Sequence, residues 1–372
     1  MFFIIFFLIL ITGLSYVLWH IWLVLPLPAL LKGLIVALCG ACVLLLVAGL
    51  SPWIDQWPMA VSVKVYEIGT TSLIVLMYLT LAFLLLDVGR LLHLVPKEWL
   101  VHNLRTTLVL SMVLILLMVY GNIHYNHPKR QSLELLTDKP IEREMTFVMV
   151  SDLHLGYHNR RETLHKWVEM INNEHADAVL IAGDIVDRSP RPLTIDSMAV
   201  EFRKLNAPVF ACLGNHEYYS GVPDVLQFYA DAGIQLLRDT AIVFRKDMLI
   251  IGRDDRMKAR RKHLKDLLPQ PDSTHFTVLL DHQPYHLEEA EQAGVDFQFS
   301  GHTHHGQVWP ISWITDNVYE KAYGSHLRGK THYYITSGLG IWGAKVRIGT
   351  CSEYVVVRIK KKNKPIIEPN FT

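Results

Sequence analysis

The chain contains 372 residues, of which 51% are hydrophobic, and its formal net charge is +1. The 36 basic and 35 acidic side chains leave no large positive excess of the kind that accompanies nucleic-acid binding. A disulfide framework is excluded as well, because the four cysteines lie in apolar stretches typical of helices and buried strands.

The first third of the chain has the composition of a membrane region. Only nine charged side chains precede residue 129. A helix needs about 20 mostly apolar residues to cross a bilayer, and four stretches approach that length: residues 2–25, 30–50, 68–86 and 108–121. We therefore predict a transmembrane region with four helices over residues 1–125, in which 108–121 is the shortest span.

The four apolar stretches carry essentially no ionisable residue at their centres. This favours an anchor, or a platform that gathers a lipid substrate, over a transporter. The first stretch has no basic segment before it and is long for a signal peptide, so we interpret it as uncleaved. Lysine and arginine residues flank both ends of the stretches and leave the orientation open.

The remaining residues predict a soluble α/β domain over residues 144–362, which follows a linker at 126–143 and precedes a tail at 363–372. Short, wholly apolar runs are typical of strands that are buried on both faces. Six occur in this part: residues 146–150, 178–182, 209–213, 248–251, 276–280 and 297–299. Between the first two runs, residues 162–174 place apolar side chains at helical spacing. Alternating strands and helices indicate an α/β fold.

Polar side chains follow five of the six runs, at the point where each predicted strand ends. They occur as Asp152-Leu153-His154, Gly183-Asp184-Ile185-Val186-Asp187, Gly214-Asn215-His216-Glu217, Asp281-His282 and Gly301-His302-Thr303-His304-His305. Ligands of α/β sheets bind just beyond the carboxyl ends of the strands. We therefore expect carboxylate, imidazole and amide groups to meet at one edge of the domain.

These five blocks, in this order, resemble the signature of the calcineurin-like metallophosphoesterase superfamily: D-x-H, G-D-x-x-D, G-N-H-[DE], a single His and G-H-x-H. The resemblance covers about residues 144–360. The form G-H-T-H-x-G-Q and the membrane region are most similar to bacterial phosphodiesterases of the YaeI and YkuE type. The resemblance implies a two-sheet α/β/β/α sandwich after the four helices. The four-helix region lies outside the resemblance. Its predicted spans, taken with the bacterial relatives, predict an integral protein of the bacterial cytoplasmic membrane, with the face of the catalytic domain left open.

The resemblance further implies a centre of two divalent metal ions, with Asp184 as the bridge between them. The ligands would be Asp152, His154, Asp184 and His304 for one ion, and Asp184, Asn215, His282 and His302 for the other. Mixed oxygen and nitrogen ligands suit Mn, Zn or Fe. Two such ions lower the pKa of a shared water, and the resulting hydroxide would attack phosphorus in line.

The motif positions imply further roles. His216 follows a predicted ligand and is expected to act as a general acid, or to stabilise charge on the leaving oxygen. Asp187 is expected to hydrogen-bond to a ligand or to a strand-end amide, whereas Glu217 either orients His216 or caps the local structure. The candidate substrate-binding residues are Arg253, His305 and Tyr218. For His305 the alternative is the loop surface, and for Tyr218 it is packing.

Two stretches and one histidine allow further predictions. The basic run at residues 253–265 is either a solvated helix face or a patch that binds lipid headgroups. The apolar stretch at 309–314 contains Trp309 and Trp313, and it is either part of the core or a contact with an acyl chain or the bilayer. His158 is predicted to lie on the surface.

Together these features predict a membrane-anchored hydrolase of phosphodiester or pyrophosphate bonds. The membrane region favours a lipid or lipid-linked substrate, with UDP-diacylglucosamine as one specific candidate. A nuclease or a cyclic-nucleotide phosphodiesterase is the alternative enzyme, although the net charge of +1 makes nucleic acid an unexpected partner. A non-catalytic membrane scaffold is a third hypothesis, but such proteins usually lose metal ligands, and all seven are present here.

Overall fold

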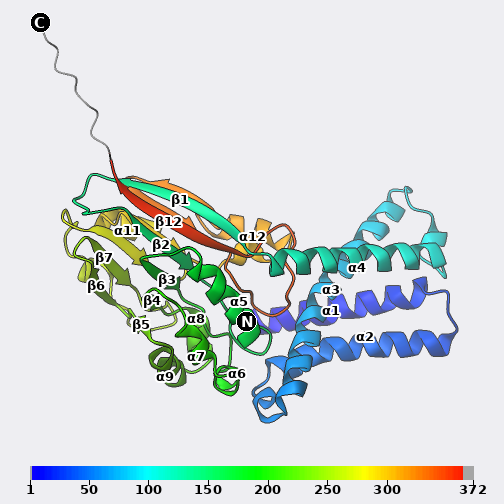
Figure 1. The fold of residues 1–372 in the computed structure, drawn as a ribbon. Coiled ribbons are helices and arrows are strands. Elements are labelled where there is room, and N and C mark those ends of the chain that lie inside the picture. Colours follow the sequence, from blue (N-terminus) through cyan, green and yellow to red (C-terminus); the bar gives the residue numbers. More distant parts are fainter. Residues whose placement is uncertain (1, 363–372) are drawn as a thin grey trace, which may run out of the picture. The chain divides into compact units, whose positions relative to one another are not determined.

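The computed structural model describes residues 2–362, with side chains from residue 8 onward. Contacts within the chain divide it into two units (Figure 1). The first comprises the residues up to 123 together with 343–348, and the second comprises 124–342 and the chain from 349 onward. The predicted tail at 363–372 lies outside the described residues.

Four long helices make up most of the first unit: α1 (Phe2–Val24), α2 (Ala29–Leu50), α3 (Met59–Leu91) and α4 (Leu104–Asn126). The 3-10 helices η1 (Pro52–Gln56) and η2 (Lys97–Trp99) lie in the connections after α2 and α3. Pro28 and Pro58 lie directly before α2 and α3. Proline has no backbone N–H, and at this position a helix does not need one for its hydrogen bonds. Within residues 343–348, the N–H of Arg347 donates to the carbonyl oxygen of Gly121 at 2.9 Å.

Three of these helices, α2, α3 and α4, are long and apolar enough to cross a membrane. In α1 the described side chains form the shorter apolar segment Leu8–Val24, so the predicted span 2–25 stays a prediction. The predicted span 108–121 is too short, because α4 has 23 residues. The helix continues through polar residues because their side chains bond within it: Oγ1 of Thr107 donates to the carbonyl oxygen of Asn103 at 2.9 Å.

Two mixed sheets of six strands each form the second unit. Their strand orders are β1-β12-β2-β3-β4-β5 and β10-β11-β9-β8-β7-β6. The first sheet consists of β1 (Lys129–Thr137), β2 (Met145–Val150), β3 (Ala178–Ala182), β4 (Val209–Cys212), β5 (Ile234–Leu236) and β12 (Glu353–Lys361). The second consists of β6 (Thr240–Phe244), β7 (Met248–Gly252), β8 (Phe276–Leu280), β9 (Phe297–Ser300), β10 (Gly324–Arg328) and β11 (Thr331–Ile335).

Helices pack on the outer faces of both sheets, so this unit has four layers. The first sheet is covered by α5 (Arg161–Asn172), α6 (Arg191–Ile195), α7 (Met198–Phe202) and α9 (Val222–Ala232). The second sheet is covered by α10 (Leu264–Leu267) and α11 (Leu287–Ala293). Three further helices lie in the connections after β4 and β9: α8 (Asn215–Tyr219), η3 (His304–Gly306) and α12 (Ile311–Val318).

The two faces of each inner strand explain this layering. In β2, Phe147 and Met149 join the core between the sheets, whereas Val148 and Val150 pack beneath the helices. Side chains alternate between the faces of a strand, so a strand that is covered on both sides needs an uninterrupted apolar run. The six predicted runs are confirmed as β2, β3, β4, β7, β8 and β9.

Strand β1 lies within residues 126–143, where the sequence predicted a linker. It pairs in parallel with β12 along its whole length, from Lys129 opposite Glu353 to Thr137 opposite Lys361 (Figure 1). Its first residues are polar and exposed, and only Leu135 and Thr137 are buried, so its sequence lacks the apolar run of an inner strand. Because β1 begins at Lys129, only residues 127 and 128 connect it to α4.

Candidate metal centre

The loops after β2, β3, β4, β8 and β9 bring the motif residues together at one edge of the unit. Six residues of the motif blocks other than glycine have a positive φ: Asp152, His154, Asp184, His302, His304 and His305. A residue other than glycine adopts this left-handed region at a cost of about 1–3 kcal/mol. Their concentration in these loops indicates a backbone that is shaped to position side chains.

Two glycines of the motifs leave room for the carboxylates. A Cβ atom at Gly214 would lie 2.1 Å from Oδ1 of Asp184, and a Cβ atom at Gly301 would lie 2.2 Å from Oδ2 of Asp152. Any side chain at either position would displace an acidic group. Close approach of the loops therefore explains the glycines of the G-N-H and G-H-x-H blocks.

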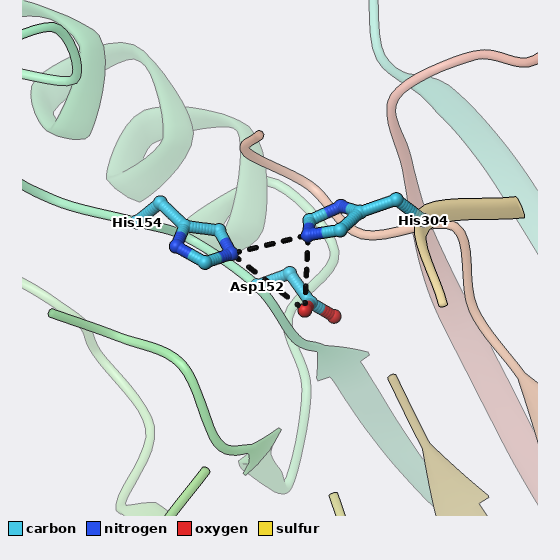
Figure 2. Close-up of side chains that lie close together, drawn as sticks. All are labelled: Asp152, His154 and His304. Carbon is cyan, nitrogen blue, oxygen red and sulfur yellow. Dashed lines mark hydrogen bonds and ion pairs between the residues drawn. The ribbon is translucent and has the colours of Figure 1, made fainter. Parts of the chain in front are cut away.

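Asp152, His154 and His304 form a first cluster, which Figure 2 shows. Nε2 of His154 lies 3.2 Å from Nε2 of His304. Oδ1 of Asp152 lies 3.5 Å from Nε2 of His304 and 3.8 Å from Nε2 of His154. Two imidazole nitrogens and a carboxylate oxygen thus converge from the loops after β2 and β9.

Asp184, His282 and His302 form a second cluster, next to Asn215. Nε2 of His282 lies 3.1 Å from Oδ2 of Asp184 and 3.2 Å from Oδ1 of Asn215. Nδ1 of His282 donates to the carbonyl oxygen of Ala182 at 2.7 Å, so Nε2 is the nitrogen that would bind a metal once the ring is neutral. The structure thus brings together all seven residues that were predicted as ligands.

Asp184 connects the two clusters. Its Oδ2 lies 3.7 Å from Nε2 of His154 in the first cluster and 3.1 Å from Nε2 of His282 in the second. Its Oδ1 accepts a hydrogen bond of 2.9 Å from the backbone N–H of His216. The residue that was predicted as the bridge therefore contacts imidazole nitrogens of both clusters.

The buried acids of the clusters are held in their ionised forms. Burial alone would raise the pKa of Asp152, but the charge of His304 and the nearby imidazole of His154 hold it well below its usual range. Burial would likewise raise the pKa of Asp184, but His282 holds it far below that range. Ionised carboxylates among imidazoles are the groups that bind divalent cations, and imidazoles that carry a proton must release it on binding.

Asp187 lies among three histidines, outside both clusters. Its Oδ1 lies 3.3 Å from Nδ1 of His154 and 3.5 Å from Nδ1 of His216, and its Oδ2 lies 4.0 Å from Nδ1 of His158. Burial disfavours a charged His154, but the neighbouring carboxylates of Asp152 and Asp187 outweigh it and raise its pKa to about 10. Nδ1 of His216 also contacts the carbonyl oxygen of Asp187. Asp187 is therefore placed to orient both imidazoles.

Replacing Asp187 by Asn is expected to weaken the binding of a divalent cation by about 10–100-fold. An amide lacks the charge that orients the neighbouring imidazoles. The loop should persist, because the N–H of residue 187 still donates to the carbonyl oxygen of Leu155, a bond of 2.9 Å. Calorimetric titration of Mn²⁺ into metal-stripped protein measures the change. Asp224→Asn, at an exposed position in α9, is the matched control, and an affinity within twofold of wild type would refute the orienting role.

Glu217 is fully buried, and its carboxylate accepts hydrogen bonds from four backbone N–H groups. Oε1 bonds to the N–H groups of Ile185 and Val186, at 2.7 and 3.0 Å. Oε2 bonds to those of Asp184 and Gly214, at 3.0 and 2.6 Å. The carboxylate therefore joins the loop after β3 to the loop after β4, which favours the predicted structural cap over an orienting contact with the His216 ring.

Arg253, which was predicted to bind substrate, lies inside the second unit. It is 3% exposed, and its Nη1 donates to Asp281 at 3.2 Å and to Glu289 at 2.6 Å. Arg261 of the same basic run pairs with Asp281 as well, at 3.0 Å. The run is a loop that leads into the four-residue helix α10. The prediction that Arg253 contacts substrate is therefore wrong, because Arg253 and Arg261 form ion pairs inside the fold. The prediction that the run forms a helix face is also wrong, because most of the run is a loop.

Tyr218 and His305, the other predicted substrate-binding residues, have contacts outside the two clusters. The hydroxyl of Tyr218 donates to Asp254 at 2.5 Å. The ring of His305 stacks on Tyr323 with 4.8 Å between centroids, and its Nε2 lies 3.4 Å from Oδ1 of Asp316. These contacts favour the alternatives of packing for Tyr218 and of the loop surface for His305, which is partly exposed.

His158 was predicted on the surface, but it is only 2% exposed. The chain after β2 folds back, with Leu155 bridged to both Asn159 and Val186, and this path carries His158 to Asp187. The prediction is wrong because burial here depends on a bridge between two loops. A lone histidine in a polar stretch carries no signal of such a contact.

The apolar stretch after the first cluster is largely exposed. Trp309, Trp313 and Ile314 are 44%, 61% and 62% exposed. The alternative that these side chains pack in the core is therefore wrong. Within residues 309–314 only the small Ser312 is buried.

Comparison with known proteins gives consistent matches. The profile of the calcineurin-like phosphoesterase family matches residues 145–306, which include all five motif blocks. An uncharacterized metallophosphoesterase of Aquifex aeolicus is 30% identical over 260 residues, covering 67% of this chain and 98% of that protein. One of Helicobacter pylori strain J99 is 28% identical over 242 residues, which cover 64% of this chain and 65% of that protein. The uncharacterized metallophosphoesterase YkuE of Bacillus subtilis is 29% identical over 232 residues, covering 58% of this chain and 79% of that protein.

Proposed function

Because the chain belongs to the calcineurin-like metallophosphoesterase family and is a metal-dependent phosphoester hydrolase, we propose that it cleaves a phosphodiester or pyrophosphate bond in a lipid or lipid-linked substrate. The observation that carries this proposal is the pair of adjoining donor clusters that share contacts with Asp184. The support for a lipid is the set of three helices that are long and apolar enough to cross a membrane. A bacterial cytoplasmic membrane is the proposed location.

The donor atoms fit two divalent cations. The first would be held by Asp152, His154, Asp184 and His304, and the second by Asp184, Asn215, His282 and His302. The support is that the donor atoms within each cluster of acids and histidines lie within 4.8 Å of one another. Two carboxylates, four imidazoles and an amide suit Mn, Zn or Fe. When bound, such ions polarise the phosphoryl oxygens and increase the acidity of water.

His216 is proposed as the residue that protonates the leaving oxygen. Its backbone N–H is bonded to Asp184, and its Nδ1 is held by the carbonyl oxygen of Asp187. In the protonated ring, the proton on Nε2 is therefore the one available to a substrate. The side chain of His216 is 15% exposed, whereas that of His154 is fully buried, so His216 is the more accessible of the two.

The proposal is tested with the full-length protein in nanodiscs, stripped of metal by a chelator and then given Mn, Zn or Fe. We expect stripping to lower hydrolysis of bis-p-nitrophenyl phosphate by about 10²-fold or more, with recovery on adding metal. Phospholipids and a nucleotide-linked diacyl sugar are then compared with this soluble substrate and with cyclic nucleotides. Full activity without metal would contradict the metal centre. A higher kcat/KM for cyclic nucleotides than for every lipid would contradict the substrate class.

A further inference from the structure

Helix α12 presents a continuous apolar surface to its surroundings. Trp313, Ile314 and Val318 are 61%, 62% and 57% exposed; Ile314 and Val318 are neighbours on the helix surface because they are four residues apart, and Trp313 directly precedes Ile314. Trp309, just before the helix, is 44% exposed and lies edge-on to Trp313, with 5.3 Å between ring centroids. We call these four side chains the α12 face. Four large apolar side chains that are exposed together indicate a contact with another apolar phase.

The α12 face is attached to the loop that carries His302 and His304. A Cβ atom at Gly306 would lie 2.3 Å from the backbone nitrogen of Ser312, so the loop and the first turn of α12 are in direct contact. The chain that follows α12 is also bonded to this loop: the carbonyl oxygen of Ala322 accepts a hydrogen bond of 2.7 Å from Oγ1 of Thr303. The loop is therefore fixed to the chain on both sides of α12, and the α12 face has a defined position relative to the first cluster.

The α12 face has the side chains of a membrane-interface contact. Tryptophan is enriched where the apolar part of a bilayer meets water, because its large ring is apolar and its N–H can remain hydrated. A short amphipathic helix with Trp and Ile on one side lies in the plane of the interface rather than across it. Asp316, the acidic residue of α12, is 3.4 Å from Nε2 of His305, so its charge has a partner on the metal-binding loop.

The length of the connecting chain favours a bilayer over a soluble partner. Helix α4 is apolar enough to cross a membrane and ends at Asn126, and β1 begins at Lys129. Two intervening residues span about 10 Å at most. The second unit therefore remains beside the bilayer at all times, whereas a soluble partner would have to be captured from dilute solution.

We propose that the α12 face inserts into the lipid–water interface and holds the metal-binding loop beside the phosphate groups of membrane lipids. Docking itself requires only a bilayer. The further claim, that docking delivers a lipid substrate, rests on the proposed function. The two claims have separate measurements.

Docking is tested by quenching of tryptophan fluorescence with brominated phospholipids in nanodiscs that contain the full-length protein. Trp313→Phe is compared with Trp167→Phe, since Trp167 is a buried residue of α5 in the same unit. The contribution of each tryptophan is the fluorescence that the wild type has and the variant lacks. Brominated lipids should quench the contribution of Trp313 and leave that of Trp167 unquenched. If the Trp313 component is quenched no more than that of Trp167, the docking proposal is overturned.

Delivery of substrate is tested with the double variant Trp313→Ser, Ile314→Ser. We expect kcat/KM to fall about tenfold or more for a phospholipid in nanodiscs and to stay within twofold for bis-p-nitrophenyl phosphate. The matched control is Ile195→Ser, Val200→Ser, because these side chains are 53% and 54% exposed on α6 and α7. An equal loss on both substrates, or an equal loss in the control, would overturn the delivery role. If the wild type cleaves no lipid, the proposed function fails, and the quenching still decides docking.

Discussion

Replacing Asp184 by Asn is expected to lower kcat for phosphodiester hydrolysis by about 10³-fold or more and to remove most of the bound metal. Asp184 contacts His154 of the first cluster and His282 of the second, through Oδ2 at 3.7 and 3.1 Å. An amide removes a negative charge that contacts imidazole nitrogens of both clusters. Because the pKa of Asp184 lies far below its usual range, this charge is present throughout the neutral pH range.

The measurement pairs steady-state hydrolysis of bis-p-nitrophenyl phosphate with metal analysis by mass spectrometry. Asp224→Asn makes the same chemical change at an exposed position in the first turn of α9 and should retain full activity and metal content. A matching far-UV circular dichroism spectrum shows whether the variant is folded. Folded Asp184→Asn with wild-type activity would remove the basis for a shared centre.

Replacing Glu217 by Gln is expected to have the largest effect on stability, about 3 kcal/mol or more. Each carboxylate oxygen of Glu217 accepts two backbone N–H groups in a fully buried position. In glutamine an NH₂ group replaces one of these oxygens, so two backbone donors would face another donor. The apparent melting temperature of the second unit should fall by about 6–12 °C.

Differential scanning fluorimetry of the protein in detergent measures this change, with protein concentration and metal content held constant. Glu169→Gln on α5 is the matched control, since the Glu169 side chain is 64% exposed. The catalytic loops are joined through Glu217, so the variant should also bind metal more weakly. A melting temperature of Glu217→Gln within 1 °C of that of Glu169→Gln would show that the four hydrogen bonds do not stabilise the fold.

Most of the differences between prediction and structure concern how far individual side chains are exposed. The core interpretation of Trp313 is wrong and the surface interpretation of His158 is wrong. Apolar composition alone does not tell whether a short helix is covered, because covering depends on what else packs against it. Likewise, Arg253 was predicted to face a substrate, but two acids far along the chain neutralise it inside the fold.

The sequence by itself determined the six inner strands, the α/β class and the residues at the strand ends, because burial on both faces requires an uninterrupted apolar run and polar ligands must follow it. Tertiary structure alone decided the role of Glu217, the strand β1 and the exposure of the α12 face. The backbone donors of Glu217 and the partner strand of β1 belong to distant segments, and contacts between distant segments leave no periodic pattern in either one.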